Sequence, residues 1–272
     1  VGSNCGVIGQ NSMVFVDTTV YWMSDEGGFF VFDGSVKRMA CTVEDFVFKT
    51  TGTNPGLNFN AGQQVYASHN SLFNEITWFY PDASNTFNNR MVVYNYLEQT
   101  WVTGTLARSS YADQAVFDKP YATKFTQNSA PNFPTVNGIS SSQGKSTYYE
   151  HETGVNEVDA NGNKTAIAAF IESGDFDLDV EGDGEFFMKI RRFIPDFKIL
   201  NGNAKVTLDL RDYPNDTATS SPLGPFTVTS STDKIDTRAR ARLAALKIEN
   251  DSTDENWRLG LFRVETQQAG RR

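Results

Sequence analysis

The sequence has few of the residues on which most metal and catalytic sites depend. It contains two histidines, His69 and His151, and two cysteines, Cys5 and Cys41, in 272 residues. The segment "HETGV" from His151 lacks the second histidine of the zinc-protease pattern, and neither cysteine has a histidine near it in the sequence. We therefore predict no metal centre, no cofactor and no nucleophilic catalysis, and we expect two buried, reduced thiols.

Long apolar runs and a phosphate-binding loop are also missing. The longest apolar stretches, such as "VFVDTTVYW", are far shorter than the roughly 18 residues of a membrane helix, and no signal-peptide pattern is present. The segment "GISSSQGKS" has five residues between its glycines, where the phosphate loop has four, and it leads into a strand pattern instead of a helix. We expect no membrane insertion and exclude nucleotide hydrolysis.

The residues that are abundant favour strands and turns. Twenty-one glycines and nine prolines accompany many phenylalanines, tyrosines, valines and threonines, and almost no apolar pattern has the helical period of 3.6 residues. With 39% hydrophobic residues, the chain is long enough to bury a sizeable core. We therefore predict an all-β fold.

The N-terminal part contains a weak repeat. "TTVYWMSDEGGFFVFDGSVKRM" and "NEITWFYPDASNTFNNRMVVYNYLEQTW" both run from an aromatic strand through turns to further hydrophobic strands, about sixty residues apart, and "KSTYYEHETGV" is a partial third copy. Small meandering sheets at such a spacing are typical of β-propeller blades. A propeller closes with roughly four to eight blades, so we expect either that further blades precede Val1 or that the copies form an open arrangement.

The chain is predicted to divide at a polar loop. Residues 128–145 are rich in proline, serine, asparagine and glycine, which separates propeller-like blades in residues 1–127 from an antiparallel β-rich domain in residues 146–272. Six segments of that domain have the period of two typical of strands, which favours a β-sandwich. We interpret "TRARARLAALKIE" as a strand, although its residues are also good helix formers, and we pair it with "WRLGLFRVE" as a hairpin.

Three arginines stand on alternate positions near the end of an acidic chain. The whole chain has a net charge of −9, whereas residues 238–272 hold seven arginines and one lysine against five acids, a balance of +3. In a strand, Arg238, Arg240 and Arg242 share one face. The next predicted strand carries Arg258 and Arg263, which its alternation places on opposite faces. The surplus is small for direct nucleic-acid binding, so we interpret the set as subunit-interface or DNA-proximal residues: Arg238, Arg240, Arg242, Arg258 and Arg263.

An acidic run in "ESGDFDLDVEGDGE" has the same alternation. A helix–loop–helix calcium site does not fit it, because Val180 and Phe186 stand where that motif needs glycine and glutamate, although an irregular cation site stays open. Three interpretations remain: pairing with the arginines across a subunit boundary, a channel lining that repels DNA phosphates, and a solvated edge strand. This acidic ladder consists of Asp175, Asp177, Asp179, Glu181, Asp183 and Glu185.

Several segments together resemble a known family. "MVFVDTTVYWMSDEGGFFVFDGSVKRMACTVEDFVF" and "NEITWFYPDASNTFNNRMVVYNYLEQTWVTGTLAR", with "KIDTRARARLAALKIE" and "WRLGLFRVETQQAGRR" at the end, resemble the tail hub or nozzle proteins of short-tailed bacteriophages, also called packaged-DNA stabilisation proteins. The chain departs from that pattern with "RARL" in place of "RGRQ" and with "QQAGRR" in place of "PDGRR".

The resemblance implies a non-enzymatic virion protein that is assembled in the host cytoplasm. It implies a ring, expected to be a hexamer, built on propeller-like domains around the DNA channel, where it retains packaged double-stranded DNA without reading its sequence. The portal or adaptor and the tail fibres or spikes are the implied partners. The alternative function is a propeller-type carbohydrate-binding or glycan-cleaving protein, since propellers host glycosidases and the chain is rich in aromatic residues; a cellular interaction scaffold is a third.

Overall fold

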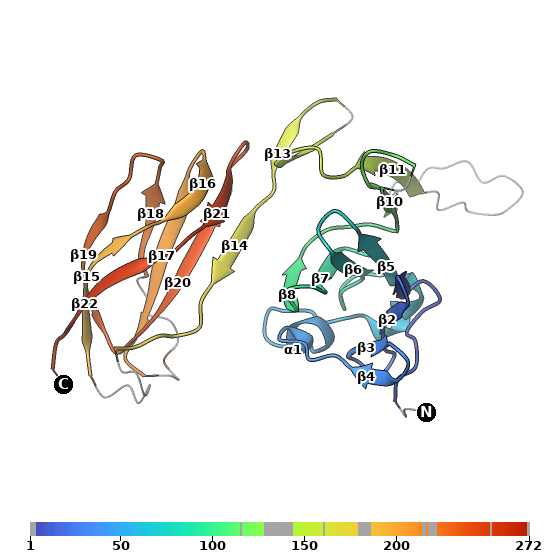
Figure 1. The fold of residues 1–272 in the computed structure, drawn as a ribbon, viewed down its shortest axis with the longest axis horizontal. Helices are drawn as coiled ribbons and strands as arrows, with labels where there is room; N and C mark the ends of the chain where they lie inside the picture. Colours follow the sequence, from blue (N-terminus) through green and yellow to red (C-terminus); the bar gives the residue numbers. More distant parts are fainter. Residues whose placement is uncertain are drawn as a thin grey trace, which may run out of the picture. The chain divides into compact units, whose positions relative to one another are not determined.

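The computed structural model describes residues 4–114, 116–127, 144–159, 161–178, 186–213, 216, 222–250 and 252–270. The chain forms two compact units, Val1–Thr153 and Gly154–Arg272 (Figure 1). Antiparallel sheets make up nearly all of the regular structure, and the helices in the described residues are one short α-helix and one 3₁₀-helix. The predicted all-β class is confirmed.

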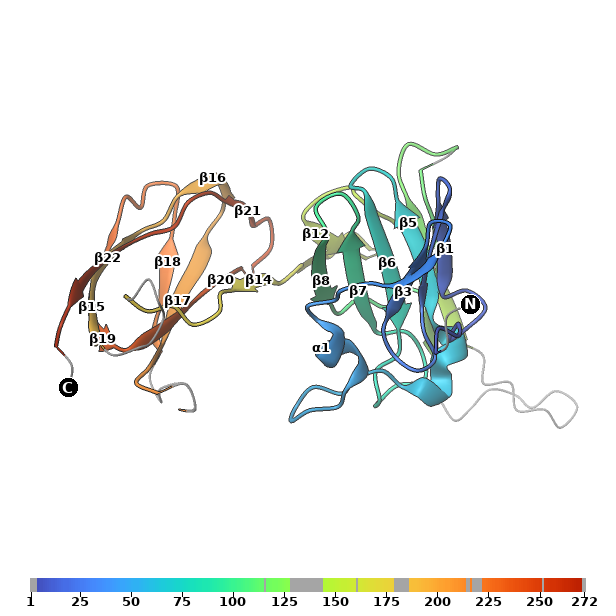
Figure 2. The same cartoon turned by 60° about the horizontal axis from the view of Figure 1, so that its bottom comes forward.

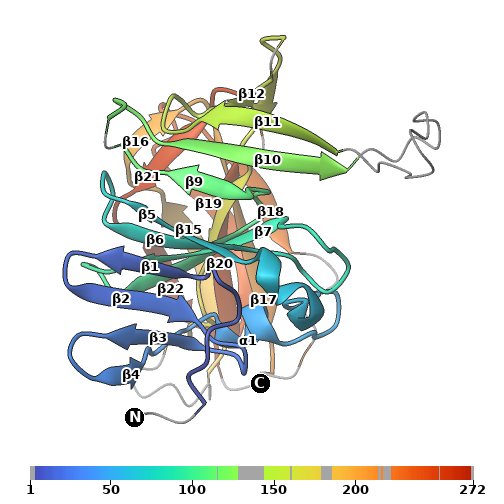
Figure 3. The same ribbon diagram turned by 90° about the vertical axis from the view of Figure 1, so that its right-hand side faces the viewer.

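The first unit consists of three antiparallel sheets that follow one another along the chain (Figure 3). The first sheet contains β1 Met13–Val16, β2 Thr19–Met23, β3 Phe29–Phe32 and β4 Val36–Arg38. The second contains β5 Tyr66–Asn70, β6 Glu75–Tyr80, β7 Arg90–Asn95 and β8 Thr100–Gly104. The third contains β9 Ser110–Ala112, β10 Tyr121–Gln127 and β11 Gly144–Glu150. The helices α1 Glu44–Phe48 and η1 Phe59–Gln64 lie between the first two sheets in sequence.

The three sheets stack as successive propeller-like blades. β1, the first strand of the first sheet, lies next to β5, and β5 lies next to β9. Trp78, Phe29 and Trp101 connect the first two sheets: the Trp78 ring centroid lies 4.8 Å from Phe29 and 6.1 Å from Trp101, and the Trp78 Nε1–H donates to the Ser12 carbonyl oxygen at 3.0 Å. Burial of these large aromatic surfaces is the main stabilising contribution to the stack.

The predicted repeat contains the last three strands of each of the first two sheets, but it misses the first strand of each, β1 and β5. Its two copies correspond to β2–β4 and β6–β8, with the first turn closing at Gly28, whose φ of +100° favours glycine. The third copy, "KSTYYEHETGV", begins within β11, and β11 pairs with β10. The C-terminal unit therefore begins at Gly154 and not at residue 146. Residues 128–143 of the predicted linker lie outside the described residues, and residues 144–145 belong to β11.

The second unit is an antiparallel sandwich (Figure 2). One layer has the order β14-β20-β17-β18, with β14 Ala169–Glu172, β17 Ala204–Arg211, β18 Leu223–Val228 and β20 Leu243–Asn250. The other has the order β19-β15-β22, with β15 Met188–Ile194, β19 Ile235–Ala241 and β22 Arg263–Gln268. Two further pairs are β16 Phe197–Asn201 with β21 Asn256–Leu259, and β12 Asn156–Val158 with β13 Lys164–Ala166. Side chains of both layers form one core, which includes Ile190, Phe193, Val206, Leu208 and Ile248.

The arginine segment is extended, as predicted, but it belongs to both layers. The strand is interrupted at Arg242, so β19 pairs with β15 in one sheet and β20 pairs with β14 and β17 in the other. The predicted hairpin with "WRLGLFRVE" is therefore wrong. That segment divides at residues 260–262 into β21, which pairs with β16, and β22, which pairs with β15.

Candidate interaction surfaces

The arginine ladder belongs to a larger basic surface on the sandwich. Along β19, Arg238 and Arg240 are exposed while Ala239 and Ala241 are buried, so the two arginines point away from the core. The neighbouring strand β15 places Lys189 opposite Arg240 in the ladder. We call the outward side chains of the β19-β15-β22 sheet the basic face; its exposed cations are Lys189, Arg191, Arg238, Arg240 and Arg263.

A β-bulge adds to the positive charge of this face. The register of β15 shifts between Ile190 and Arg192 on both of its neighbours, and Ile190 and Phe193 on either side of the bulge are buried. Arg191 is exposed and Arg192 is half-buried, so neither guanidinium group is in the core. A bulge of this kind places two consecutive side chains on one side of a sheet.

The acidic residues of the basic face are both paired with Arg192. Its Nε lies 2.6 Å from Asp236 Oδ1, and its Nη1 lies 3.7 Å from Glu265 Oε2. The hydrogen bond from Arg192 holds the pKa of Asp236 below its ordinary value. Among the described residues, no carboxylate forms an ion pair with Lys189, Arg191, Arg238 or Arg263. The face therefore has a surplus of positive charge.

Arg242 has a different environment from Arg238. At the point where the strand changes sheets, its guanidinium carbon lies 4.8 Å from the ring centroid of Phe187 and 5.6 Å from that of Tyr213. The guanidinium of Arg240 also lies over Phe187, at 4.1 Å. Cation–π contacts of this kind hold arginines in place. Arg242 is half-buried and packs at the junction of the two layers, whereas Arg238 is solvent-exposed.

The described part of the acidic ladder is bound within its own chain. Nη1 of Arg211, on β17, donates to both carboxylate oxygens of Asp175 at 2.8 and 2.7 Å. The backbones of Phe176 and Ala244 exchange two hydrogen bonds, so the start of the acidic run lies along β20. Asp177 lies within the described residues and also interacts with another group of the chain. The other four predicted positions, Asp179, Glu181, Asp183 and Glu185, lie outside the described residues.

Arg258 and Arg263 both point away from the core, although their spacing predicts opposite faces. Trp257 and Leu259 pack on the core from β21, which leaves Arg258 exposed. After the interruption at residues 260–262, Val264 packs on the core and Arg263 is exposed. The interruption between β21 and β22 reverses the alternation.

The first unit carries an exposed apolar sheet face that the sequence analysis did not identify. One side of the first sheet packs on the second sheet through residues such as Val16, Met23 and Phe29. The other side, which we call the apolar face, consists of two cross-strand rows. Its exposed apolar side chains are Met13, Phe15, Phe32 and Val36, and Phe15 is 66% exposed. Trp22 and Phe30 are buried, since Trp22 Nε1 donates to the Cys5 carbonyl oxygen and the Arg38 guanidinium lies over the Phe30 ring. The rows are Met13–Trp22–Phe30–Arg38 and Phe15–Val20–Phe32–Val36.

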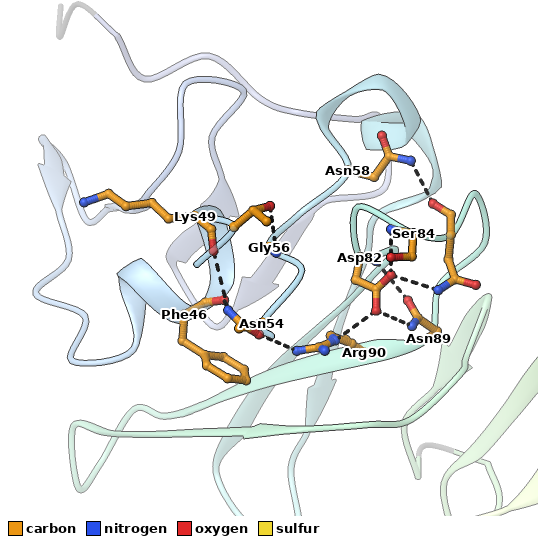
Figure 4. Close-up of polar contacts among 11 residues, drawn as sticks. Phe46, Lys49, Asn54, Gly56, Asn58, Asp82, Ser84, Asn89 and Arg90 are labelled. Atoms are coloured by element: carbon orange, nitrogen blue, oxygen red, sulfur yellow. Dashed lines mark hydrogen bonds and ion pairs between the residues drawn. The ribbon is translucent and has the colours of Figure 1, made fainter. Parts of the chain in front are cut away.

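A polar network fixes the loop between β6 and β7 (Figure 4). The Asp82 carboxylate, which is nearly buried, accepts hydrogen bonds from Ser84 N, Asn85 Nδ2, Asn89 Nδ2 and Arg90 Nε at 2.8–3.1 Å. Arg90 Nη1 in turn donates to Asn54 Oδ1, and Asn54 Nδ2 donates to the Phe46 carbonyl oxygen. Burial alone would raise the pKa of Asp82, but these hydrogen bonds lower it below its ordinary value. The network ties the second sheet to the segment around α1.

A small cavity lies beside the third sheet. Its volume is about 300 Å³, and its walls combine the Phe87 and Phe125 rings with polar side chains. Asn88 Nδ2 donates to the carbonyl oxygens of Gln64 and Arg108, whereas its buried Oδ1 accepts no hydrogen bond from any described residue. The lining residues are Gln64, Phe87, Asn88, Arg108, Ser109, Phe125 and Ser146.

Among the described residues, the one carboxyl group with a raised pKa, Glu75, lies away from this cavity. Glu75 has a raised pKa, caused first by burial and then by the charges of Glu152 and Glu98. It lies beside Asn70 at one end of β5, whereas Gln64 of the cavity precedes the other end. The length of β5 separates them by about 13 Å. Among the described residues, no group of three histidine, cysteine, aspartate or glutamate side chains could hold a metal ion.

The cysteines differ from their predicted environment. No disulfide joins Cys5 and Cys41, and both are half-buried instead of buried. Burial, with a smaller contribution from the Glu44 charge, raises the pKa of the Cys41 thiol to about 11, which keeps it protonated. In the part of the chain that the structure describes, no helix is long and apolar enough to cross a membrane.

Comparisons with known proteins do not assign the chain to a family. No family model matches it, and no curated protein matches it. Among solved structures, it is similar to an exo-β-1,3-galactanase from Phanerochaete chrysosporium determined with galactose, with 9% sequence identity and a TM-score of 0.25 over 93% of this chain and 68% of that chain. A TM-score this low carries no inference about fold or activity.

Proposed function

We propose that the chain is a non-enzymatic structural subunit of the tail of a short-tailed bacteriophage. In this function it is part of a hub or nozzle ring, a hexamer of this chain around the DNA channel, which retains packaged DNA and connects the portal or adaptor to the distal tail parts. The observation that carries the proposal is the apolar face of the first sheet, on which a phenylalanine is 66% exposed. Large apolar patches of this kind mark surfaces that are covered in an assembly.

Two further features support a structural function. Both units are built from short antiparallel strands with rigid aromatic or aliphatic cores. Both histidines are held by side-chain contacts: His69 Nε2 lies 3.2 Å from Tyr96 Oη, and His151 Nε2 accepts a hydrogen bond from Arg108. The resemblance of the sequence to hub proteins gives the same function.

Cryo-electron microscopy of the parent particle tests the proposal. We expect density for the three sheets and the sandwich in a ring around the tail channel, with the apolar face in contact with neighbouring protein. Particles in which this chain is missing from that ring, or in which Phe15 and Phe32 face solvent, would contradict the proposal.

The cavity beside the third sheet favours a second candidate, a carbohydrate-binding protein. Aromatic rings that face polar groups are suited to sugars, and the buried Asn88 Oδ1 is available as an acceptor. Hydrolysis has less support, because the carboxyl group with a raised pKa, Glu75, lies at the far end of β5 from this cavity. A glycan array combined with a hydrolysis assay separates the two candidates, since a tail hub should show neither binding nor turnover.

A further inference from the structure

We propose that the basic face of the sandwich binds the phosphate backbone of double-stranded DNA without reading its sequence. The inference rests on the proposed function for its biological setting and deepens it by naming the surface that contacts DNA. It depends on an arrangement that the sequence does not show locally, because Lys189 and Arg191 lie about fifty positions before Arg238 and Arg240 and join them only through the pairing of β15 with β19.

The geometry of the sheet spaces these charges evenly. Arg238 and Arg240 are two residues apart on one strand, which corresponds to roughly 7 Å, and β19 and β22 are two strands apart, which corresponds to roughly 10 Å. Duplex DNA carries one negative charge per about 1.7 Å of its axis. Several cations at this spacing can therefore contact several phosphates at once.

The counter-charges on the face do not cancel this attraction. Asp236 and Glu265 both lie beside Arg192, and Asp236 also lies 3.3 Å from Lys234 Nζ, so both acids are already paired with cations. Lys189, Arg191, Arg238 and Arg263 form no ion pair with a described residue and are all exposed. Solvated arginines and lysines of this kind release DNA counterions on binding.

The composition of the face favours duplex DNA over an acidic protein or a single strand. Stable protein interfaces have an apolar or aromatic centre, and single-strand sites use aromatic rings on which bases stack. The one large hydrophobic side chain exposed on the described part of this sheet is Ile194, at 37%. The half-buried Phe187 ring, directly before β15, is already stacked by the guanidinium groups of Arg240 and Arg242. A charged surface whose neighbouring ring is occupied in this way fits a rigid polyanion that is recognised by its charge.

The test measures the binding of a fluorescent duplex of about 30 base pairs to the 272-residue chain by anisotropy. We expect a Kd of about 1–10 µM near 50 mM salt, weakened about 40- to 150-fold near 200 mM, as three or four phosphate contacts predict. The double substitution Arg191→Ser with Arg238→Ser should weaken binding at least about tenfold near 50 mM salt and reduce the salt slope by about two. The charge-preserving pair Arg191→Lys with Arg238→Lys should retain binding.

A matched control removes two positive charges from exposed strand and loop positions of the first unit. The pair Lys49→Ser with Lys145→Ser changes the net charge equally, and we expect less than about a twofold change in Kd. Slow amide hydrogen exchange in β15 and β17 confirms that the variant sandwich is folded, since both strands supply its core.

Four results would overturn the inference: no duplex binding near 50 mM salt, an equal loss in the control pair, tighter binding of a single strand of the same length, or equal binding of polyglutamate at the same charge concentration. The last result would assign the face to an acidic protein. These failures are distinguishable from failure of the proposed function, because a chain present in the tail ring can lack DNA affinity, and a DNA-binding chain can be absent from the ring.

Discussion

Arg108 Nε donates a hydrogen bond to Nε2 of His151 at 2.9 Å, so this histidine is neutral in the folded chain. Burial, together with the Arg108 charge, lowers the pKa of His151 to about 4, whereas an unfolded histidine titrates near 6.5. Between these values the unfolded chain binds one proton more than the folded chain. The free energy of unfolding therefore has its full value above about pH 6.5 and decreases as the pH falls toward 4.

This pairing predicts a loss of about 2 kcal/mol in the stability of the first unit between about pH 7 and pH 4, reduced from the full shift because His151 is partly solvated. Urea unfolding followed by tryptophan fluorescence measures it. His151→Gln keeps an acceptor for Arg108 but does not titrate, so the difference between the two proteins isolates the histidine from the carboxylates. An unchanged pH dependence in the variant would contradict the assignment.

The Asp82 network predicts a large effect of a single substitution. Asp82→Ala should lower the free energy of unfolding of the first unit by about 3 kcal/mol, because it leaves the nearly buried Arg90 and two asparagines without their acceptor. Asp33→Ala is the matched control, since it removes a solvent-exposed ion pair with Lys37 that should contribute little to stability. Equal losses in urea unfolding would show that the network is not a stabilising element.

The apolar face predicts an assembly defect without a folding defect. Phe15→Asp should leave the stability of the isolated chain nearly unchanged, because Phe15 is 66% exposed, but should weaken docking onto the tail about thirtyfold if that ring is buried at a contact. The measurement is the fraction of particles with complete tails. Leu97→Asp, at a site that is 68% exposed in the turn between β7 and β8, is the control and should assemble normally.

The arginines of the ladder are predicted to separate into structural and binding residues. Arg242→Ser should lower the free energy of unfolding of the sandwich by about 1–2 kcal/mol, because its guanidinium packs on Phe187 and Tyr213. Arg238→Ser should change it by less than about 0.5 kcal/mol, because this side chain is exposed. Amide hydrogen exchange of the sandwich strands, measured at increasing urea concentration, tests both. A larger loss for Arg238→Ser would place that residue in the structural class.

Local patterns predicted the strands well where aromatic and β-branched residues were dense. Segments such as "VYWM" and "ITWFY" have this composition, and they form β2 and β6. The inner strand β5, "YASHN", carries polar residues that give a weak strand signal, and it is held in place by its neighbours β6, β1 and β9. Its existence therefore depends on tertiary contacts that sequence alone does not contain.

The candidate surfaces were predictable only in part, because each depends on pairing between distant strands. The five proposed arginines are all in the described residues, but Lys189 and Arg191 were missed because their place beside the ladder depends on the register of β15 with β19. The hairpin was wrong because no local signal marks the change of sheet at Arg242. The apolar face was missed for the same reason, since it becomes continuous only when four strands align.

The passage of one segment through both layers of the sandwich has a consequence for folding. Because β19 and β20 are joined by the single residue Arg242, each layer holds half of a continuous segment, and the unfolding of one layer releases one end of the segment that the other layer holds. The two layers should therefore unfold in one cooperative transition, and amide protons in β15 and β17, the central partners of the two halves, should exchange with solvent at a common slow rate.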